Sequence, residues 1–130
     1  MKIAVSSFGV DSKEKMDPRF GRCEYFQIYD TESGEYTAVE NAAKDSPQGA
    51  GIAASQDIID RGVDVLVTGK LGPNAYELLN ESDIRLYTSE SVSVEEVVSL
   101  YTDGKLGVIS SPGVGHAGLK SSGSGRNRYR

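Results

Sequence analysis

The chain has 130 residues, a length typical of one domain. Hydrophobic residues make up 38% and charged residues 25%, which indicates a globular protein with a modest core. No run approaches the roughly 18 to 20 apolar residues that a membrane span needs. The N-terminus lacks a cleavable signal pattern, and a single cysteine excludes an internal disulfide. Together these features predict a soluble protein of the reducing cytoplasm.

The formal net charge of −5 is unevenly distributed along the chain. Residues 120–130 contain four basic and no acidic side chains, whereas residues 1–119 contain ten basic and nineteen acidic ones, a net −9. Because an acidic body repels phosphate backbones and anionic lipids, neither nucleic acid nor a membrane is an expected partner. We expect a domain over 1–104 and a glycine-rich, basic, flexible tail over 105–130. Docking on the acidic body, docking on a partner and remaining solvated are all open for the tail.

The first third of the chain has the patterns of three strands. Residues 3–5 form a short apolar run, as expected of a buried strand. Residues 24–30 and 35–40 are rich in aromatic and β-branched side chains. The turn-forming residues 31–34 lie between them, which predicts a β-hairpin.

A helix and a central strand are predicted next. The helix starts at Gly49 and ends at Gly62, because glycine commonly terminates helices. Its apolar residues keep a helical period at Ile52, Ala53, Ile59 and Val63. Residues 65–67 are then continuously apolar, which is typical of a strand buried on both faces.

Two further helices flank one more predicted strand. Pro73 suits the first turn of the second helix, and the strand covers residues 84–87. Ser93 and Glu96 have the spacing of a capping box for the third helix, which Gly104 ends. The predicted buried faces are Ala75, Leu78 and Leu79 in the second helix, and Val94, Val97, Val98 and Tyr101 in the third.

The predicted order β-β-β-α-β-α-β-α indicates a ribonuclease H-like α/β fold, with a five-stranded mixed sheet and helices on both faces. Right-handed crossovers place the first, fourth and fifth strands side by side and parallel. Four connections then gather at one end of the sheet: residues 8–23, 41–49, 68–73 and 88–93. Because open α/β sheets bind ligands at the carboxyl ends of parallel strands, a site is expected there.

The long loop over 8–23 is the first candidate binding segment. Its end contains Arg19, Phe20, Gly21 and Arg22. The two guanidinium groups have a spacing that would clamp an anion. In the alternative interpretation, Asp17 pairs with Arg19 and Phe20 anchors the loop on the sheet.

Two glycine-rich helix starts face the same end of the predicted sheet. One contains Gly49 and Gly51, and the other contains Gly69, Lys70 and Gly72. Free backbone N–H groups at a helix N-terminus attract anions. Neither segment matches a Walker A loop or a dinucleotide fingerprint, and close packing of strand against helix explains such glycines equally well.

Cys23 and His116 are the single thiol and the single imidazole of the chain. Cys23 follows Arg22, whose charge would lower a thiol pKa, so it is a candidate soft metal ligand or redox thiol. A buried, inert cysteine is the alternative. His116 lies in a glycine-rich segment that would either close over a cofactor or be exposed. No Cys/His cluster suits zinc, and the number of candidate ligands alone indicates no cofactor.

No catalytic constellation is evident in the sequence, so no enzymatic activity is predicted. Nucleases of the ribonuclease H type need a carboxylate in the first strand to hold metal ions. Residues 3–7 contain no acid, and the nearest, Asp11, is already in the loop. The nucleophile elbow of hydrolases and the His-Glu-x-x-His motif are also absent from the sequence.

Four segments taken together resemble a known family. They are residues 2–7 (KIAVSS), 19–26 (RFGRCEYF), 49–54 (GAGIAA) and 67–75 (VTGKLGPNA). In this order they resemble the dinitrogenase iron–molybdenum cofactor biosynthesis family, which includes nitrogenase cofactor carrier proteins. The resemblance covers residues 1–104. It implies a small stand-alone, non-catalytic domain with a ribonuclease H-like fold that carries a metal–sulfur cluster.

The resemblance also implies a site for an iron–sulfur or iron–molybdenum cluster. Arg19, Arg22, Lys70 and the helix N-termini would offset the charge of such a cluster. Cys23 or His116 would be its ligand. The expected partners are the cluster and a protein that donates or accepts it, and the chain is expected to be a monomer or a homodimer.

Two other classes of function remain open at this stage. A small-anion or nucleotide-binding regulatory module would use the two glycine-rich helix starts and Arg19. An interaction module would use its basic tail to recruit an acidic partner.

Overall fold

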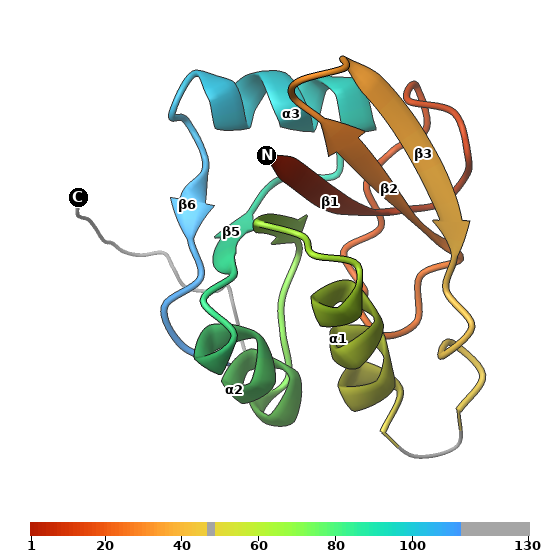
Figure 1. Cartoon of the computed structure of the whole chain (residues 1–130), viewed down its shortest axis with the longest axis vertical. Coiled ribbons are helices and arrows are strands. Elements are labelled where there is room, and N and C mark those ends of the chain that lie inside the picture. Colours follow the sequence, from red (N-terminus) through yellow and green to blue (C-terminus); the bar gives the residue numbers. More distant parts are fainter. Residues whose placement is uncertain (47–48, 113–130) are drawn as a thin grey trace.

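A computed structural model describes residues 1–46 and 49–112. A mixed β-sheet forms the middle layer, with α1 and α2 on one side and α3 on the other (Figure 1). The strands are β1 (Lys2–Ser7), β2 (Tyr25–Asp30), β3 (Glu35–Glu40), β4 (Val65–Thr68), β5 (Arg85–Thr88) and β6 (Gly107–Val108). The helices are α1 (Ala50–Asp60), α2 (Pro73–Glu81) and α3 (Val94–Thr102). Within the described ranges, no helix is both long and apolar enough to cross a membrane.

The strand order of the sheet is β3-β2-β1-β4-β5-β6. Strands β1, β4 and β5 are adjacent and parallel, which confirms the arrangement expected from right-handed crossovers. The predicted hairpin is confirmed as the antiparallel pair β2 and β3. Its turn uses Gly34 at φ 75°, a left-handed conformation that glycine adopts without steric cost.

The prediction of a five-stranded sheet is wrong by one strand. Strand β6 pairs antiparallel with β5, and the amide of Ile109 donates a 2.9 Å hydrogen bond to the carbonyl of Leu86. Two residues are too few to show an alternating pattern, so pairing with an existing edge is what defines this strand. Residues 107–110, expected in the tail, therefore pack on the domain. The predicted tail from residue 113 onward, with His116, lies outside the described residues.

Each face of the sheet has its own hydrophobic core. Successive strand residues point to opposite faces, so β1 contributes Ala4 to the α1/α2 side and Val5 to the α3 side. All four residues of β4 are buried, as predicted for a central strand. Large, fully buried side chains include Phe26, Ile58, Leu66, Leu71 and Leu79 on the α1/α2 side, and Ile3, Met16, Val67 and Val94 on the α3 side.

Not all of the apolar positions that keep a helical period in α1 are buried. Ile52 is 42% exposed and Ala53 is also exposed, although Ile59 is half-buried and Val63 is buried. The residues of α1 that are buried are Ala50, Ala54, Ser55 and Ile58. The first turns of this face have small residues because the backbone of Gly21 lies directly against the start of the helix. Ile52 in the first turn is therefore turned outward, whereas Ile58, further along the helix, is buried.

The third helix confirms its predicted start, inner face and end. The Oγ of Ser93 accepts a 3.2 Å hydrogen bond from the amide of Glu96. Val94, Val97 and Val98 are buried, and Tyr101 is half-buried against the same core. Gly104 follows the helix at φ 72°.

Candidate functional site

The connections predicted to gather at one end of the sheet do lie together there. Isolated backbone bridges join the loop over 8–23 to its neighbours: Ser7 with Met16, Lys15 with Ser93, and Arg19 with Lys70. The loop thus contacts the connections after both β4 and β5. It brings its arginines to the carboxyl ends of the parallel strands.

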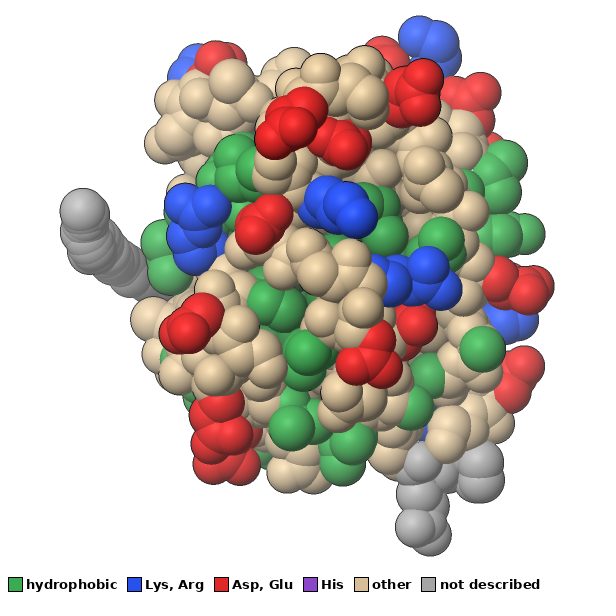
Figure 2. Space-filling view, viewed as in Figure 1, with side chains coloured by type: hydrophobic (Ala, Val, Ile, Leu, Met, Phe, Trp, Pro, Cys, Tyr) green, Lys and Arg blue, Asp and Glu red, His purple; other side chains and the backbone are tan. Residues whose placement is uncertain are grey.

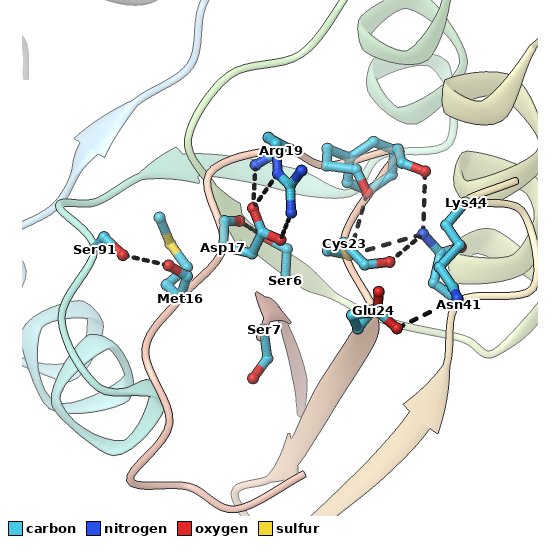
Figure 3. A network of polar contacts seen from close by, with 12 residues as sticks. Ser6, Ser7, Met16, Asp17, Arg19, Cys23, Glu24, Asn41, Lys44 and Ser91 are labelled. Carbon is cyan, nitrogen blue, oxygen red and sulfur yellow. Dashed lines mark hydrogen bonds and ion pairs between the residues drawn. The ribbon is translucent and has the colours of Figure 1, made fainter. Parts of the chain in front are cut away.

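Asp17 and Arg19 form the central polar contact of this end (Figure 3). Asp17 Oδ1 accepts hydrogen bonds from the backbone N (2.9 Å) and Nε (3.0 Å) of Arg19, and Oδ2 accepts one from Nη2 (2.8 Å). This hydrogen-bonded carboxylate raises the pKa of Arg19. The Asp17 side chain is fully buried while that of Arg19 is 59% exposed. Pairing of Asp17 with Arg19, the alternative interpretation, is therefore present, and the outer side of the guanidinium remains open.

Two hydroxyl groups near the ends of β1 and β4, those of Ser6 and Thr68, fix the turn at Asp17. Ser6 Oγ donates a 2.6 Å hydrogen bond to the carbonyl of Asp17 and lies 2.7 Å from Thr68 Oγ1. A hydroxyl has one hydrogen to donate, so Thr68 is the donor of the second bond. Ser6 and Thr68 are both fully buried, so β1 and β4 jointly fix the loop.

Phe20 and Gly21 anchor the loop rather than line an open surface. Phe20 is 4% exposed, and its ring centroid lies 5.4 Å from that of Phe26. A Cβ on Gly21 would lie 3.0 Å from the backbone N of Gly51, closer than ordinary contacts. The predicted anchoring by Phe20 is thus confirmed, and glycine at position 21 is explained by close approach to α1.

Arg22 organises the connection between β3 and α1. Its Nη1 donates hydrogen bonds to the carbonyls of Lys44 (2.6 Å) and Ser46 (3.0 Å). The ammonium of Lys44 in turn lies 3.3 Å from a carboxylate oxygen of Glu24, and this hydrogen bond raises the Lys44 pKa. The guanidinium of Arg22 thus bonds to backbone carbonyls, whereas the hydrogen-bond partners of the Cys23 thiol are the Phe20 carbonyl and Asn41.

The predicted lowering of the Cys23 pKa is wrong. Cys23 has no solvent exposure, and burial, followed by the charge of Asp17, raises the pKa of its thiol to about 12. The Sγ donates a 3.3 Å hydrogen bond to the carbonyl of Phe20, and Nδ2 of Asn41 lies 3.8 Å from it. Figure 3 shows Cys23 beside Asn41, with their contact drawn as a dashed line. The structure therefore agrees with the alternative of a buried cysteine.

The two predicted glycine-rich helix starts differ in their local geometry. Gly49 precedes α1 at φ 74°, and Gly72 precedes α2 in an extended conformation. Neither residue offers a side-chain cap, so the first amides of both helices lack that partner. A Cβ on Gly69 would lie 2.5 Å from Cβ of Pro18, so close packing explains that glycine. The adjacent Lys70 is exposed.

The third helix, by contrast, has its N-terminus closed by the loop over 8–23. The amide of Val94 donates to the carbonyl of Glu14, and the amide of Glu95 donates to that of Ser12, both at 2.9 Å. Two of the amides that a helix start leaves unpaired are therefore satisfied. Among the described residues, no side chain caps the start of α1 or of α2.

The predicted site residues thus separate into two groups. The exposed cations Arg19 and Lys70 lie at the loop-rich end with the starts of α1 and α2, whereas Phe20 and Cys23 are buried and Gly21 is half-buried against α1. His116 is not among the described residues. Across 1–46 and 49–112, no three His, Cys, Asp or Glu side chains are grouped so as to hold a metal ion.

Sequence reasoning missed several residues that build this end. Asn41 is buried and donates from Nδ2 to the carbonyls of Cys23 (2.9 Å) and Gly21 (3.1 Å). Gln27, fully buried in β2, has Nε2 2.8–2.9 Å from Ser7 Oγ and from two loop carbonyls, so its two hydrogens serve three acceptors. A buried amide in a strand of aromatic and β-branched residues was the available signal for Gln27. For Asn41 the signal was its place directly after a strand.

Comparisons with known proteins agree with this architecture. The family described as dinitrogenase iron-molybdenum cofactor matches residues 1–104. An uncharacterized protein of Methanocaldococcus jannaschii is 33% identical over 109 residues, which cover 82% of this chain and 89% of that protein.

Two solved structures are similar in both fold and sequence. The apo form of the orange protein from Desulfovibrio gigas has a TM-score of 0.83 at 31% identity, covering 87% of this chain and 96% of that one. A Thermotoga protein, described as a candidate NifB protein of the DUF35 family, has a TM-score of 0.77 at 33% identity, covering 88% and 97%. The predicted resemblance is thus confirmed: the chain belongs to the dinitrogenase iron–molybdenum cofactor family.

Proposed function

We propose that this chain is a non-catalytic carrier that binds an iron–sulfur or iron–molybdenum type cluster at the loop-rich end of its sheet. Family membership supports a cofactor-binding role. The observation that carries the proposal is the grouping of exposed Arg19 and Lys70 with the uncapped starts of α1 and α2. The order of the first five strands supports a ribonuclease H-like class. The single cysteine supports a cytoplasmic location.

Electrostatics give the physical basis for binding an anionic cluster. Asp17 accepts hydrogen bonds from Nε and Nη2 of Arg19. Within the described ranges, Nη1 of Arg19 makes no hydrogen bond or ion pair. Lys70 likewise has no ion-pair partner among the described residues. Because helix N-termini carry partial positive charge, the starts of α1 and α2 add to the attraction of these two cations.

Cys23 and His116 remain the predicted ligands of the cluster. Coordination by Cys23 would require loss of the thiol proton and of its bond to the Phe20 carbonyl, both of which burial opposes. We therefore expect the cations and helix starts to supply most of the binding free energy for the cluster. Of the two candidate ligands, His116 is chemically the more favourable, since a neutral imidazole needs no deprotonation.

Anaerobic reconstitution with iron, sulfide and molybdate tests the proposal. The expected result is coloured protein with about one cluster per chain after desalting. Lys70→Ala is expected to lower the metal content markedly, whereas Lys105→Ala, which removes the same charge from an exposed position after α3, is expected to leave it unchanged. Equal metal content in the two variants would exclude Lys70 from the site.

The ligand variants extend the same measurement. Cys23→Ser is expected to retain its colour and His116→Ala to lose part of it. Loss of colour in Cys23→Ser, with its native fold intact, would make the thiol a ligand after all. A colourless, metal-free wild type would contradict the carrier function and favour the anion-binding module. Thermal shifts with phosphate, nucleotides and molybdate would then identify its ligand.

The same reconstituted samples address partners and assembly. A carrier must pass its cluster to a donor or acceptor protein, and we propose a protein–protein encounter at the loop-rich end. Mass measurement by light scattering with and without cluster distinguishes a monomer from a homodimer. Dimer formation only in the loaded state would indicate that two chains share one cluster.

A further inference from the structure

An acidic groove runs along α3 on the face of the sheet opposite α1 and α2. It has a volume of about 560 Å³. Its lining residues are Tyr29, Tyr36, Ser93, Glu95, Glu96, Val98, Ser99, Thr102 and Asp103. Figure 2 shows acidic side chains along the α3 side of the molecule, at the top of the view. The lining contains three carboxylates and no basic side chain, so the groove suits a positively charged occupant.

The carboxylates of the groove are largely available for a new partner. Glu95 forms a 3.4 Å ion pair with Lys13, whose side chain is 79% exposed. Glu96 and Asp103 are exposed and make no side-chain hydrogen bond or ion pair within residues 1–46 and 49–112. The floor is aromatic, because the ring centroids of Tyr29 and Tyr36 lie 4.7 Å apart. Arginine matches such a lining, since its guanidinium pairs with carboxylates and stacks on tyrosine rings.

We propose that the groove along α3 is the docking site of this chain's own basic C-terminal segment, residues 120–130. That segment carries Lys120, Arg126, Arg128 and Arg130 and no acid, whereas residues 1–112 hold ten basic and nineteen acidic side chains. Intramolecular charge complementarity is therefore strong, +4 against −9.

The spacing of the charges also matches. Glu96 and Asp103 are seven residues apart, so they lie on one face about 10.5 Å apart along the helix axis. In an extended segment, Arg126 and Arg130 point to the same side and lie about 13 Å apart. The two outer arginines can thus reach the two unpaired carboxylates together.

The connecting chain is long enough to reach the groove. Tyr76 Oη donates a 2.9 Å hydrogen bond to the carbonyl of Ser110, so the chain leaves the fold beside α2. The segment must therefore pass around the β6 edge of the sheet to reach α3. Residues 113–126 span up to about 46 Å when extended, against a radius of gyration of about 13 Å for a domain of 100 residues.

A spin label on the full chain tests the proposal without any cluster present. Ser124→Cys carries a nitroxide, and Cys23 is not labelled because it is buried. The expected result is selective loss of the amide NMR signals of Tyr36, Ser99 and Thr102 compared with those of α2. About 1 M salt, where the Debye length is about 3 Å, should restore them. Equal loss over α2, or no loss at all, would overturn the proposal.

Charge variants identify the groove itself. Glu96→Gln with Asp103→Asn should restore the lost signals, whereas Glu77→Gln with Glu81→Gln removes two exposed acids from α2 and should not. Persistence of the loss in the first variant would overturn docking in this groove. The loss is also measured in isotope-labelled chains mixed with spin-labelled, unenriched chains. Signal loss in that mixture would show that a second copy supplies the segment, which also overturns the intramolecular proposal.

Discussion

The two members of the Asp17–Arg19 ion pair lie in different environments: the carboxylate is fully buried, and the guanidinium is 59% exposed. Removing either member therefore has unequal consequences. A buried carboxylate without its cation is costly, whereas an exposed guanidinium without its carboxylate is solvated by water. The pair thus serves mainly to satisfy Asp17.

This asymmetry gives a first prediction on stability. Asp17→Asn should lower the free energy of unfolding by about 1–3 kcal/mol. The reason is that one carboxylate oxygen, which accepts from Arg19, becomes an NH2 group, which can only donate. Arg19→Ala should lower it further, since it strands the buried charge. Urea unfolding at neutral pH measures both changes. Arg61→Ala, which breaks the exposed pair with Asp57, is the control with a small effect. A larger loss in Asp17→Asn than in Arg19→Ala would contradict this account.

The Cys23 thiol should be unreactive in the folded protein. A pKa raised from 9.0 to about 12 lowers the thiolate fraction near neutral pH about a thousandfold, and burial blocks access as well. Iodoacetamide should therefore modify the thiol only after denaturant is added, as followed by intact mass. Rapid modification of the native protein would mean that the turn after Phe20 opens readily.

The same pKa predicts a pH dependence of stability. Folding favours the protonated thiol, so its contribution is complete below the unfolded pKa of 9.0 and declines as the pH rises from there toward about 12. Wild type should accordingly lose more stability than Cys23→Ala between about pH 8 and about pH 10. Tyrosine ionisation is common to both proteins and cancels in the comparison. Parallel pH profiles would show that the folded thiol is not perturbed.

Glycine substitutions distinguish close packing from open space. Gly69→Ala should destabilise the fold by about 1–3 kcal/mol, because its Cβ would collide with the backbone of Pro18. Gly72→Ala meets nothing within 4 Å and should cost less than about 1 kcal/mol. Thermal unfolding ranks the two variants. A similar melting temperature for both would mean that the Pro18 turn shifts without penalty.

Gln27 should control the order of the loop that follows β1. Gln27→Leu removes the donor that serves Ser7 Oγ and the carbonyls of Gly9 and Asp11. The free energy of unfolding should fall by about 1–3 kcal/mol, and residues 8–16 should exchange their amide hydrogens faster. Gln56→Leu, in which an exposed amide bonded to Asp60 is lost, is the control. Unchanged exchange over 8–16 would show that other contacts hold the loop.

The local rules of the sequence predicted most of the fold. The Ser93 cap, the turn at Gly34 and the apolar run of β4 each depend on neighbouring residues, so a single segment reveals them. Strand β6 and the buried face of α1 depend on what lies beside them in space. The first needs the open edge of β5, and the second needs the backbone of Gly21 against the helix.

The site was predictable in place but not in detail. Topology alone located the loop-rich end, because the carboxyl ends of parallel strands share one edge. The inferred effect of Arg22 on the Cys23 pKa failed, since adjacency in sequence does not imply that two side chains face each other. Arg22 bonds to the carbonyls of Lys44 and Ser46, and Cys23 points into the core.

The loop over 8–23 has contacts on both faces of the sheet. Its Arg19 bridges to Lys70 beside α2, while its Ser12 and Glu14 carbonyls accept the first amides of α3. A cargo held by the starts of α1 and α2 and a peptide lying along α3 would therefore not compete for space. This segment therefore offers one physical route by which loading of the cluster would change the affinity of the groove.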